Sequence, residues 1–322
     1  MAPPATRETP SLRCYSGWEG DPVPEFEVPE PFHERISRRE GDAGRAWLDE
    51  LPELARRLLD RWSLTVDGPV RHGYAAVVQP VRRADGTPAV LKLTWQDAET
   101  AGEPLALSTW NGRGAVLLLA HEPGALLLER LDSTRDLSTE PIGPAVEIAA
   151  ALLAELAVPA PVLPRHLRTE SERWTEELPR ESRELGHPLP SRLVDAAVGF
   201  ARERGPETAS LLVNQDLHYE NVLAGTRRPW LVIDPQPLAG DPEFGVIPLL
   251  WNRATETPVA DRLRTIVSVA GLDLDLARWW VLFRLVDAWF YALAAGDRWL
   301  LGALEPVLDW ARRLPANALA LG

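Results

Sequence analysis

The sequence predicts an α+β protein with two lobes, a first lobe built on a small antiparallel sheet and a larger second lobe that is mostly helical. Two patterns support this prediction. Short strand-like apolar runs separated by turns prevail up to residue 131, and apolar residues at helical spacing prevail from residue 144 onward. A length of 322 residues is also long for a single hydrophobic core. We therefore expect a proline-rich extension over residues 1–31, a first lobe over 32–131 and a second lobe over 132–322.

The first lobe should hold one helix within a set of short strands. A helix is also predicted ahead of the sheet, over residues 44–62, with Pro52 dividing it into a short and a longer part. The Asp-Gly pair at 85–86 predicts that the strands on either side form an antiparallel hairpin. Residues 97–110 predict the helix of the lobe, with Glu103 one to two turns inside it. The predicted strands are residues 64–66, 74–81, 89–94, 116–119 and 125–128.

The second lobe should be made mostly of helices. The span 165–190 is polar and has partial helical character. The most apolar segment, residues 279–295, contains Arg284 and Asp287 and is too short to cross a bilayer, so we expect a buried helix there. The predicted helices are residues 145–156, 191–204, 259–270 and 274–295.

The polar residues of the stretch 214–241 predict a metal site. Residues 222–224 and 230–233 read as strands joined by a turn. If residue 225 faces residue 230, Asn221 and Asp234 lie opposite each other, about 5 Å apart at Cβ. An amide oxygen and a carboxylate, with Asp216 just upstream, form a set of hard oxygen ligands suited to Mg²⁺. The polar side chains of the stretch are Asp216, His218, Glu220, Asn221, Asp234 and Asp241.

Composition limits the classes of partner. A formal charge of −13 disfavours nucleic acid and anionic membrane and mildly favours cationic small molecules, although it equally serves solubility. The single cysteine, Cys14, excludes an internal disulfide and a cysteine-based metal cluster, which fits a reducing cytosol. The N-terminus carries no apolar secretory signal. We therefore predict a cytoplasmic protein with a small-molecule substrate and no nucleic acid or membrane partner, and leave the oligomeric state open.

Lys92 stands out because it is the only lysine among 34 Lys and Arg residues. It lies inside the predicted strand 89–94, between Leu91 and Leu93. It either faces a ligand or lies on the solvated face of an edge strand, and its spacing supports both alternatives equally.

The order of these features resembles the protein-kinase-like fold. A strand lysine, a helix glutamate, an Asp-x4-Asn motif and a later Asp follow one another as in that fold. Within it the chain is most similar to the aminoglycoside phosphotransferases of the aminoglycoside/hydroxyurea antibiotic resistance kinase family, which includes streptomycin 6-phosphotransferases. The resemblance runs over roughly residues 32–300. The matching segments are residues 89–93, 112–116, 126–131, 216–223, 229–235 and 240–242.

For the second lobe the resemblance implies catalysis and substrate binding. Asp216 would be the base that faces the acceptor hydroxyl, and Asn221 and Asp234 would be the Mg²⁺ ligands. Phosphoryl transfer has a loose transition state, so catalysis is mainly positioning and charge neutralisation. Asp216 would accordingly orient the hydroxyl as much as deprotonate it.

For the first lobe the resemblance implies binding of ATP. Lys92 would bind the α- and β-phosphates and pair with Glu103. A lysine suits this role because it is a compact point charge. The main chain from Glu129 to Leu131 would hydrogen-bond adenine.

The chain departs from the family pattern at three places. Asn214 stands where the family usually has a histidine that ties the loop together by hydrogen bonds, a role that asparagine can fill in part. Gly245 stands where the family tends to have an acid. The predicted phosphate loop, residues 68–73, has glycine only at its two ends.

Each candidate residue also has a structural explanation. Asp216, Asn221 and Asp234 could be ordinary loop and hairpin residues. We expect His218 to be structural, and Asp241 to be structural as well, for example as a helix N-cap.

The helix 274–295 supplies the candidate substrate contacts. Trp280, Arg284, Asp287 and Tyr291 form a stripe along it. Arg284 and Asp287 need partners on this apolar helix, which a polar substrate could supply. The acidic span 170–184 either attracts a cationic sugar or is a solvated helix face, and we favour the solvated face.

The sequence therefore predicts an ATP- and Mg²⁺-dependent kinase that phosphorylates a hydroxyl of a streptomycin-like aminoglycoside or a related small molecule and so confers antibiotic resistance. A kinase for another natural product or metabolite is one alternative. A nucleotide-binding pseudokinase is another, motivated by Asn214 and Gly245, although Lys92, Asp216, Asn221 and Asp234 together favour an enzyme.

Overall fold

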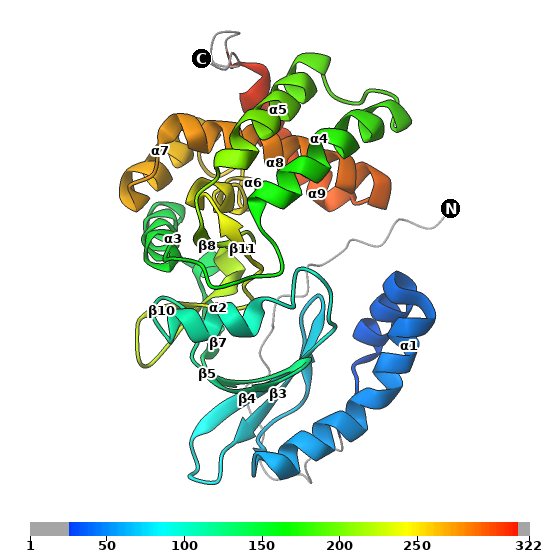
Figure 1. Cartoon of the computed structure of the whole chain (residues 1–322). Coiled ribbons are helices and arrows are strands. Elements are labelled where there is room, and N and C mark those ends of the chain that lie inside the picture. Colours follow the sequence, from blue (N-terminus) through cyan, green and yellow to red (C-terminus); the bar gives the residue numbers. More distant parts are fainter. Residues whose placement is uncertain (1–25, 315–322) are drawn as a thin grey trace, which may run out of the picture. The chain divides into compact units, whose positions relative to one another are not determined.

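The computed structural model describes residues 26–314, so most of the predicted extension over residues 1–31 lies outside the described residues. The chain forms two compact units (Figure 1). Of the described residues, the first unit comprises 26–135 together with 223–231, and the second comprises 136–222 and 232–314. The second unit thus begins a few residues later than the predicted lobe, and the tip of the 214–241 stretch belongs to the first unit.

The first unit is built on an antiparallel sheet. Strands β3 and β4 pair along their whole length, with a tight turn in which the Gly86 amide donates to the Arg83 carbonyl at 2.8 Å. The predicted hairpin is therefore confirmed. The sheet order is β1-β3-β4-β6-β5, with β2 also pairing with β3, so β4 is an inner strand. The strands are β1 Thr65–Val66, β2 Arg71–His72, β3 Ala76–Arg82, β4 Pro88–Thr94, β5 Leu118–Glu122 and β6 Ala125–Glu129.

One face of this sheet packs against a long helix, α1 (Glu30–Arg61). Because side chains alternate along a strand, Leu91 and Leu93 point to the same face. Both belong to a buried cluster with Ile36 and Leu58 of α1. Figure 1 shows α1 lying along this face of the sheet. Hydrophobic burial against the sheet therefore holds α1 in place.

Helix α1 differs from the prediction in its start and in its break. It begins at Glu30, and its non-helical residue is Gly41, with φ 61°, whereas Pro52 lies inside the helix without ending it. The predicted break at Pro52 was therefore wrong. Proline removes one amide donor from the helix, and burial of the residues around it outweighs that loss. Glycine at position 41 adopts the left-handed backbone at little cost.

The opposite face of the sheet carries Lys92 and is met by helix α2 (Glu103–Trp110). This helix begins later than predicted, because residues 97–102 form a turn in which the Asp97 carboxylate accepts hydrogen bonds from the Glu99 and Thr100 amides. Glu103 is therefore the first residue of the helix and does not lie one to two turns inside it.

The second unit is mostly helical. The helices predicted at 145–156, 191–204, 259–270 and 274–295 are all present, and the polar span 165–190 contains one as well. A further helix near the C-terminus, α9, was not predicted. Among residues 26–314, no helix is long and apolar enough to cross a membrane. The helices are α3 Ile142–Leu156, α4 Leu167–Glu184, α5 Ser191–Arg204, α6 Pro248–Trp251, α7 Val259–Ala270, α8 Leu274–Ala295 and α9 Arg298–Arg312.

Five further strands and four short 3-10 turns complete the part of the chain that the structure describes. Strands β8 and β11 pair antiparallel, and β10, β9 and β7 form a three-stranded sheet in that order. The pairing of β8 with β11 was not predicted, because each is a short four-residue run and the β9–β10 hairpin lies between them in sequence. The strands are β7 Asp132–Asp136, β8 Leu211–Asn214, β9 Val222–Ala224, β10 Trp230–Val232 and β11 Pro237–Gly240. The turns are η1 Leu137–Thr139, η2 Gly205–Glu207, η3 Tyr219–Asn221 and η4 Pro242–Gly245.

The register of the β9–β10 hairpin differs by one residue from the prediction. The Gly225 amide donates to the Pro229 carbonyl, and the Ile233 amide donates to the Asn221 carbonyl at 2.9 Å. Asn221 therefore faces Ile233 and not Asp234. The physical reason is a three-residue loop, shorter than the one assumed, and a one-residue change of register changes every facing pair.

The packing of α1 makes a testable prediction about stability. Leu58→Ala removes a fully buried side chain of α1, and we expect the free energy of unfolding to fall by about 2–5 kcal/mol. Leu105→Ala in α2 is the matched control, because 43% of Leu105 is exposed, and its effect should stay within about 0.5 kcal/mol. Urea unfolding followed by tryptophan fluorescence measures both. Equal losses for the two variants would contradict this account of α1.

Candidate active site

The candidate site centres on the loop of residues 215–221, which follows β8 and is called the Asp216 loop below. Asn214, at the end of β8, pairs with Pro237 at the start of β11. The Asn214 side-chain oxygen accepts hydrogen bonds from the Asp216 amide and the Gln236 amide, both at 3.1 Å. Asn214 thus joins the segment that carries Asp216 to the segment just after Asp234. The tying role expected in part for this residue is confirmed.

Asn221 lies at the other end of the Asp216 loop and turns back onto Asp216. Its side-chain amide donates to the Asp216 carbonyl at 3.1 Å and lies 3.4 Å from the Asp216 carboxylate. Asp234 is close enough for its negative charge to raise the pKa of Asp216. The second unit therefore gathers the predicted base and both predicted metal ligands, although the hairpin register does not place Asn221 opposite Asp234.

The backbone of Asp234 is left-handed, with φ 48°. This conformation ends the β10 strand, so strand alternation does not decide where the Asp234 side chain points. Aspartate is one of the few non-glycine residues that enter this region readily. Such outliers are enriched at functional sites, where the surrounding structure holds them.

The pKa of the Asp216 carboxyl is raised above its usual value. Burial is the largest cause that raises its pKa, and the negative charge of Asp234 raises it further. His218, Arg284 and Asn221 act in the opposite direction. The side chain is 32% exposed, and the nearest His218 nitrogen lies 3.8 Å from its oxygen, too far for a hydrogen bond. Asp216 is therefore a partly accessible carboxylate with raised basicity.

The side chains of Asn221 and Asp234 fit a divalent cation. The Asn221 nitrogen is engaged with Asp216, which leaves the amide oxygen as the atom suited to a hard metal. Asp234 adds a carboxylate. Mg²⁺ in nucleotide-using enzymes is commonly held by one or two side chains together with phosphate oxygens and water. The donor set agrees with that requirement.

The first unit contains the Lys92–Glu103 ion pair. The Lys92 nitrogen donates to both carboxylate oxygens of Glu103, at 2.6 and 2.7 Å. The two residues are 4% and 3% exposed, and β4 is an inner strand, so the alternative of a solvated edge strand for Lys92 is excluded. A buried ion pair adds little net stability because both charges lose their hydration. The two hydrogen bonds fix the direction of the Lys92 ammonium group.

Glu129 has a structural role in addition to the predicted one. Its carboxylate accepts hydrogen bonds from the Leu117 amide at 2.8 Å and from Arg227 at 2.6 Å. Arg227 also donates to the carbonyls of Gly112 and Ala115. The side chain of Glu129 therefore holds neighbouring loops together. The role of the main chain between Glu129 and Leu131 in base binding stays a prediction.

Arg284 of α8 lies next to the Asp216 loop. It donates to the Gln215 carbonyl at 2.7 Å and to the Phe244 carbonyl at 3.3 Å, and its guanidinium lies 4.6 Å from the centre of the Phe244 ring. The protein itself thus supplies polar partners for Arg284, and one of them, Gln215, directly precedes Asp216. Its predicted contact with substrate stays a prediction.

Asp287, one turn after Arg284, has a strongly shifted pKa. Burial raises the pKa of this carboxyl to about 6, with Arg284 opposing the rise and Glu181 of α4 adding to it. In α4, Arg173 pairs with Glu170 and Glu177 at 2.8 and 2.7 Å, as expected for charges along a helix face. Glu181 is different, because burial raises its pKa as well. The pKa values of two carboxyls, Glu181 on α4 and Asp287 on α8, are therefore raised, and the charge of Glu181 contributes to the rise at Asp287.

Asp241 is structural, but it is not a helix cap. It is 1% exposed, and no side-chain cap hydrogen bond is made to the η4 turn that follows it. Its oxygens accept instead from Arg204, from the Ala209 amide at 2.8 Å and from the Trp280 ring nitrogen at 3.0 Å. No sequence motif marks this cluster, because its members come from separate elements.

Gly245, the second departure from the family pattern, lies directly against the end of β8. A Cβ at this position would lie 2.8 Å from the Asn214 carbonyl oxygen and 3.3 Å from a methyl of Val213. There is no room for an acidic side chain here without moving β8. Gly245 therefore permits the close approach of η4 to the strand that leads into the Asp216 loop.

Comparisons with known proteins agree with this arrangement. Residues 61–295 match the model of a family described as aminoglycoside/hydroxyurea antibiotic resistance kinases. A streptomycin 6-kinase from Streptomyces glaucescens is 41% identical over 292 residues, covering 87% of this chain and 94% of that protein. A hydroxyurea phosphotransferase from Kitasatospora aureofaciens is 42% identical over 277 residues, covering 84% and 82%.

The fold comparison points the same way. An ethanolamine kinase from Plasmodium vivax superposes with a TM-score of 0.55 at 12% identity, covering 96% of this chain and 99% of that one. At this identity the likeness concerns the fold alone. The predicted α+β, protein-kinase-like fold is confirmed.

The close approach at Gly245 makes a prediction about stability. Gly245→Ala places a methyl against a backbone oxygen of β8, so we expect a lower melting temperature than that of the wild type. Gly302→Ala in α9 is the matched control, since a Cβ there meets nothing within 4 Å. Alanine should stabilise that helix by up to about 1 kcal/mol. Differential scanning calorimetry would disprove the close-packing account if both variants melted at or above the wild-type temperature.

Proposed function

Because the chain belongs to the aminoglycoside/hydroxyurea antibiotic resistance kinase family, we propose that it transfers a phosphoryl group from ATP, with Mg²⁺, to a hydroxyl of a streptomycin-like aminoglycoside. The chain is a small-molecule phosphotransferase of a resistance family. The observation that carries the finer proposal is the assembly of Asp216, Asn221 and Asp234 in the second unit.

In the second unit, Asp216 orients the acceptor hydroxyl and accepts its proton. The raised pKa of Asp216 brings its basicity closer to neutral pH, which favours proton acceptance. Asn221 and Asp234 would hold Mg²⁺, which when bound neutralises charge on the transferred phosphoryl group. His218 has no hydrogen bond to the base and is assigned a structural role.

In the first unit, Lys92 binds the α- and β-phosphates and Glu103 fixes the direction of its ammonium group. We assign nucleotide binding to this unit and catalysis with acceptor binding to the second unit. The main chain from Glu129 to Leu131 hydrogen-bonds the base. The reaction is proposed to take place in the cytoplasm, in keeping with a single cysteine, Cys14.

Asp287 favours a cationic acceptor. An ionised carboxylate in this half-buried position lacks full hydration, and a guanidinium or ammonium group would restore the lost interaction. Arg284, beside the Asp216 loop, would contact a hydroxyl or an ether oxygen of the same acceptor. Phosphorylation then adds negative charge to a cationic antibiotic, which would spoil its fit to an anionic target.

Two alternatives to this proposal differ from it, the first in the acceptor and the second in lacking turnover. In the first alternative, the acceptor is another natural product or metabolite, which would also present a hydroxyl to Asp216. Hydroxyurea is one such acceptor, because a relative of 42% identity is named as a hydroxyurea phosphotransferase. A nucleotide-binding pseudokinase would bind ATP without turnover, which the joint presence of Lys92, Asp216, Asn221 and Asp234 argues against. ATP consumption with streptomycin, other aminoglycosides, hydroxyurea and sugars distinguishes these cases. Thermal shift with ATP but no turnover would favour the pseudokinase.

The role of Asp216 makes a direct prediction. Asp216→Asn keeps the shape of the side chain but removes the base, and we expect kcat to fall by about 10²–10⁴-fold with little change in the KM for ATP. Asp261→Asn, on the exposed side of α7, serves as the control and should retain wild-type rates. A coupled ADP-release assay measures both. An Asp216→Asn enzyme with undiminished turnover would remove Asp216 from the mechanism.

The pKa of Asp287 makes a prediction about pH. Because the folded-state pKa is raised to about 6, the carboxyl adds stability below its unfolded pKa and loses that contribution as the pH rises through about 6. At neutral pH the ionised group therefore destabilises the fold, by on the order of 1 kcal/mol. Asp287→Asn should raise the melting temperature at neutral pH and should increase the KM for a cationic acceptor.

The wild-type profile provides the complementary test. As the pH falls below about 6, protonation of Asp287 should increase the KM for the cationic acceptor, whereas the Asp287→Asn enzyme should show no such rise. Acceptor KM values measured across this range decide the matter. Identical pH profiles for the two proteins would exclude Asp287 from acceptor binding.

A further inference from the structure

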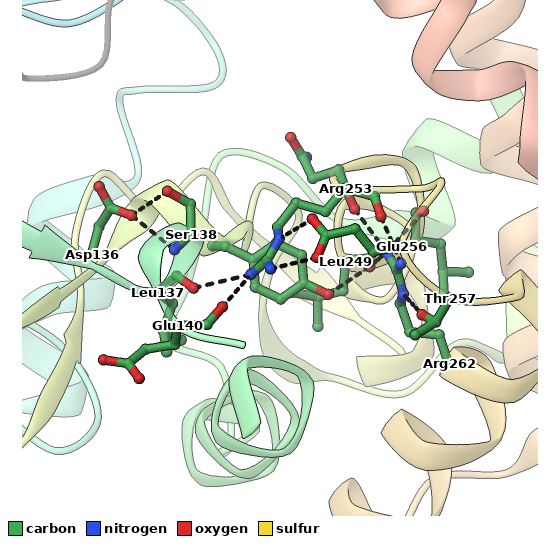
Figure 2. Close-up of polar contacts among 12 residues, drawn as sticks. Asp136, Leu137, Ser138, Glu140, Leu249, Arg253, Glu256, Thr257 and Arg262 are labelled. Carbon is green, nitrogen blue, oxygen red and sulfur yellow. Dashed lines mark hydrogen bonds and ion pairs between the residues drawn. The ribbon is translucent and has the colours of Figure 1, made fainter. Parts of the chain in front are cut away.

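Arg253, in the segment between α6 and α7, has an unusual backbone and a fully engaged side chain. Its φ is 55°, in the left-handed region that a non-glycine residue enters only at a cost in free energy. Its guanidinium makes two hydrogen bonds of 2.7 Å to the Glu256 carboxylate. It also donates to the Leu137 and Glu140 carbonyls, at 3.3 and 2.9 Å (Figure 2). The side-chain contacts hold the backbone in its strained form.

The same guanidinium contacts the Asp216 loop through Tyr219. It lies 5.5 Å from the centre of the Tyr219 ring, within the range of a cation–π interaction. Tyr219 is 1% exposed and begins the η3 turn, which ends at Asn221. Its hydroxyl donates to the Leu249 carbonyl at 2.9 Å, and burial raises its pKa to about 12, so the phenol stays protonated. Tyr219 is therefore fixed at both its ring and its hydroxyl.

Arg262 of α7 hydrogen-bonds the backbone of the segment that contacts Tyr219 and carries Arg253. It is 3% exposed and donates to the Leu249 carbonyl at 3.1 Å, the same oxygen that receives the Tyr219 hydroxyl. It also donates to the Asn252 carbonyl at 2.8 Å and to the Arg253 carbonyl at 2.7 Å. Figure 2 shows Arg262 beside Arg253. The segment 249–253 is thus tied down by one buried guanidinium.

We propose that Arg253 is a positioning residue for phosphoryl transfer, acting on Asp216 and Asn221 through Tyr219. Tyr219 lies between these two residues in the Asp216 loop, and Asn221 in turn donates to Asp216. Loss of the guanidinium over the Tyr219 ring frees the η3 turn to shift, and a displacement of about 1 Å at a catalytic group can cost roughly 100-fold in rate. This proposal rests on the proposed function, because it assigns Arg253 to the same reaction.

The left-handed backbone offers a variant that separates activity from folding. Arg253→Gly removes the side chain and also relieves the backbone strain, so its effect on the melting temperature should be small. We expect kcat to fall roughly 10- to 100-fold in this variant. We also expect half-maximal activity to need more Mg²⁺, because Asn221 ends the turn that Tyr219 begins. The KM for the acceptor should not change.

Two further variants refine the test. Arg253→Lys keeps a cation but not the two-pronged geometry, so it should recover only part of the rate. Arg264→Ala, on the same helix as Arg262, removes an exposed pair with Asp261 and should leave kcat and the Mg²⁺ requirement unchanged. Guanidinium ion added below denaturing concentrations should raise the kcat of Arg253→Gly and not that of the wild type.

The outcomes are distinct. A folded Arg253→Gly enzyme with wild-type kcat and Mg²⁺ dependence would overturn the positioning role alone. So would a variant that melts earlier but shows the wild-type rate per folded molecule, because Arg253 would then serve stability only. A wild-type protein that transfers no phosphate from ATP to any acceptor would overturn the proposed function and this role with it.

Discussion

The geometry of the candidate site depends on the antiparallel pairing of β8 and β11. This pairing places the end of one short strand beside the start of the other, at Asn214 and Pro237. The Asn214 side chain then bonds the amides of both segments, so the Asp216 loop and the segment just after Asp234 cannot drift apart. Gly245 permits this arrangement because any larger residue would press on the Asn214 carbonyl. Two departures from the family pattern are thus neighbours in space.

A second constraint is the burial of ionisable side chains, which lose hydration and need partners within the protein. Lys92 and Glu103 are both buried and satisfy each other within the first unit. Asp241 receives hydrogen bonds from Arg204, Ala209 and Trp280 within the second unit. Asp287 is different. Burial raises its pKa to about 6, and the opposing charge of Arg284 does not cancel this rise. A buried carboxyl whose pKa stays raised marks a place where a ligand can add the interaction that the protein lacks.

Local backbone strain appears at two positions of the second unit to which we assign roles in the proposed reaction. Asp234 and Arg253 both have left-handed backbones. Asp234 is a candidate metal ligand, and Arg253 stacks on Tyr219 inside the Asp216 loop. In each case side-chain contacts or neighbouring strands hold a conformation that the residue would leave if free. The positions of Asp234 and Arg253 therefore depend on the packing of the residues around them.

The sequence by itself determined the fold class and the order of the motifs. The Asp-Gly turn at residues 85–86 predicted the β3–β4 hairpin, and hydrophobic periodicity predicted helices α7 and α8, because these signals are local and visible in the chain. The motif order also singled out Lys92, Glu103, Asp216, Asn221 and Asp234, whose roles stay predictions. Only the tertiary structure decided the uninterrupted helix at Pro52, the hairpin register at Asn221, the pairing of β8 with β11, and the contacts of Arg253. These depend on packing and hydrogen bonds between residues far apart in sequence, which local propensity cannot encode.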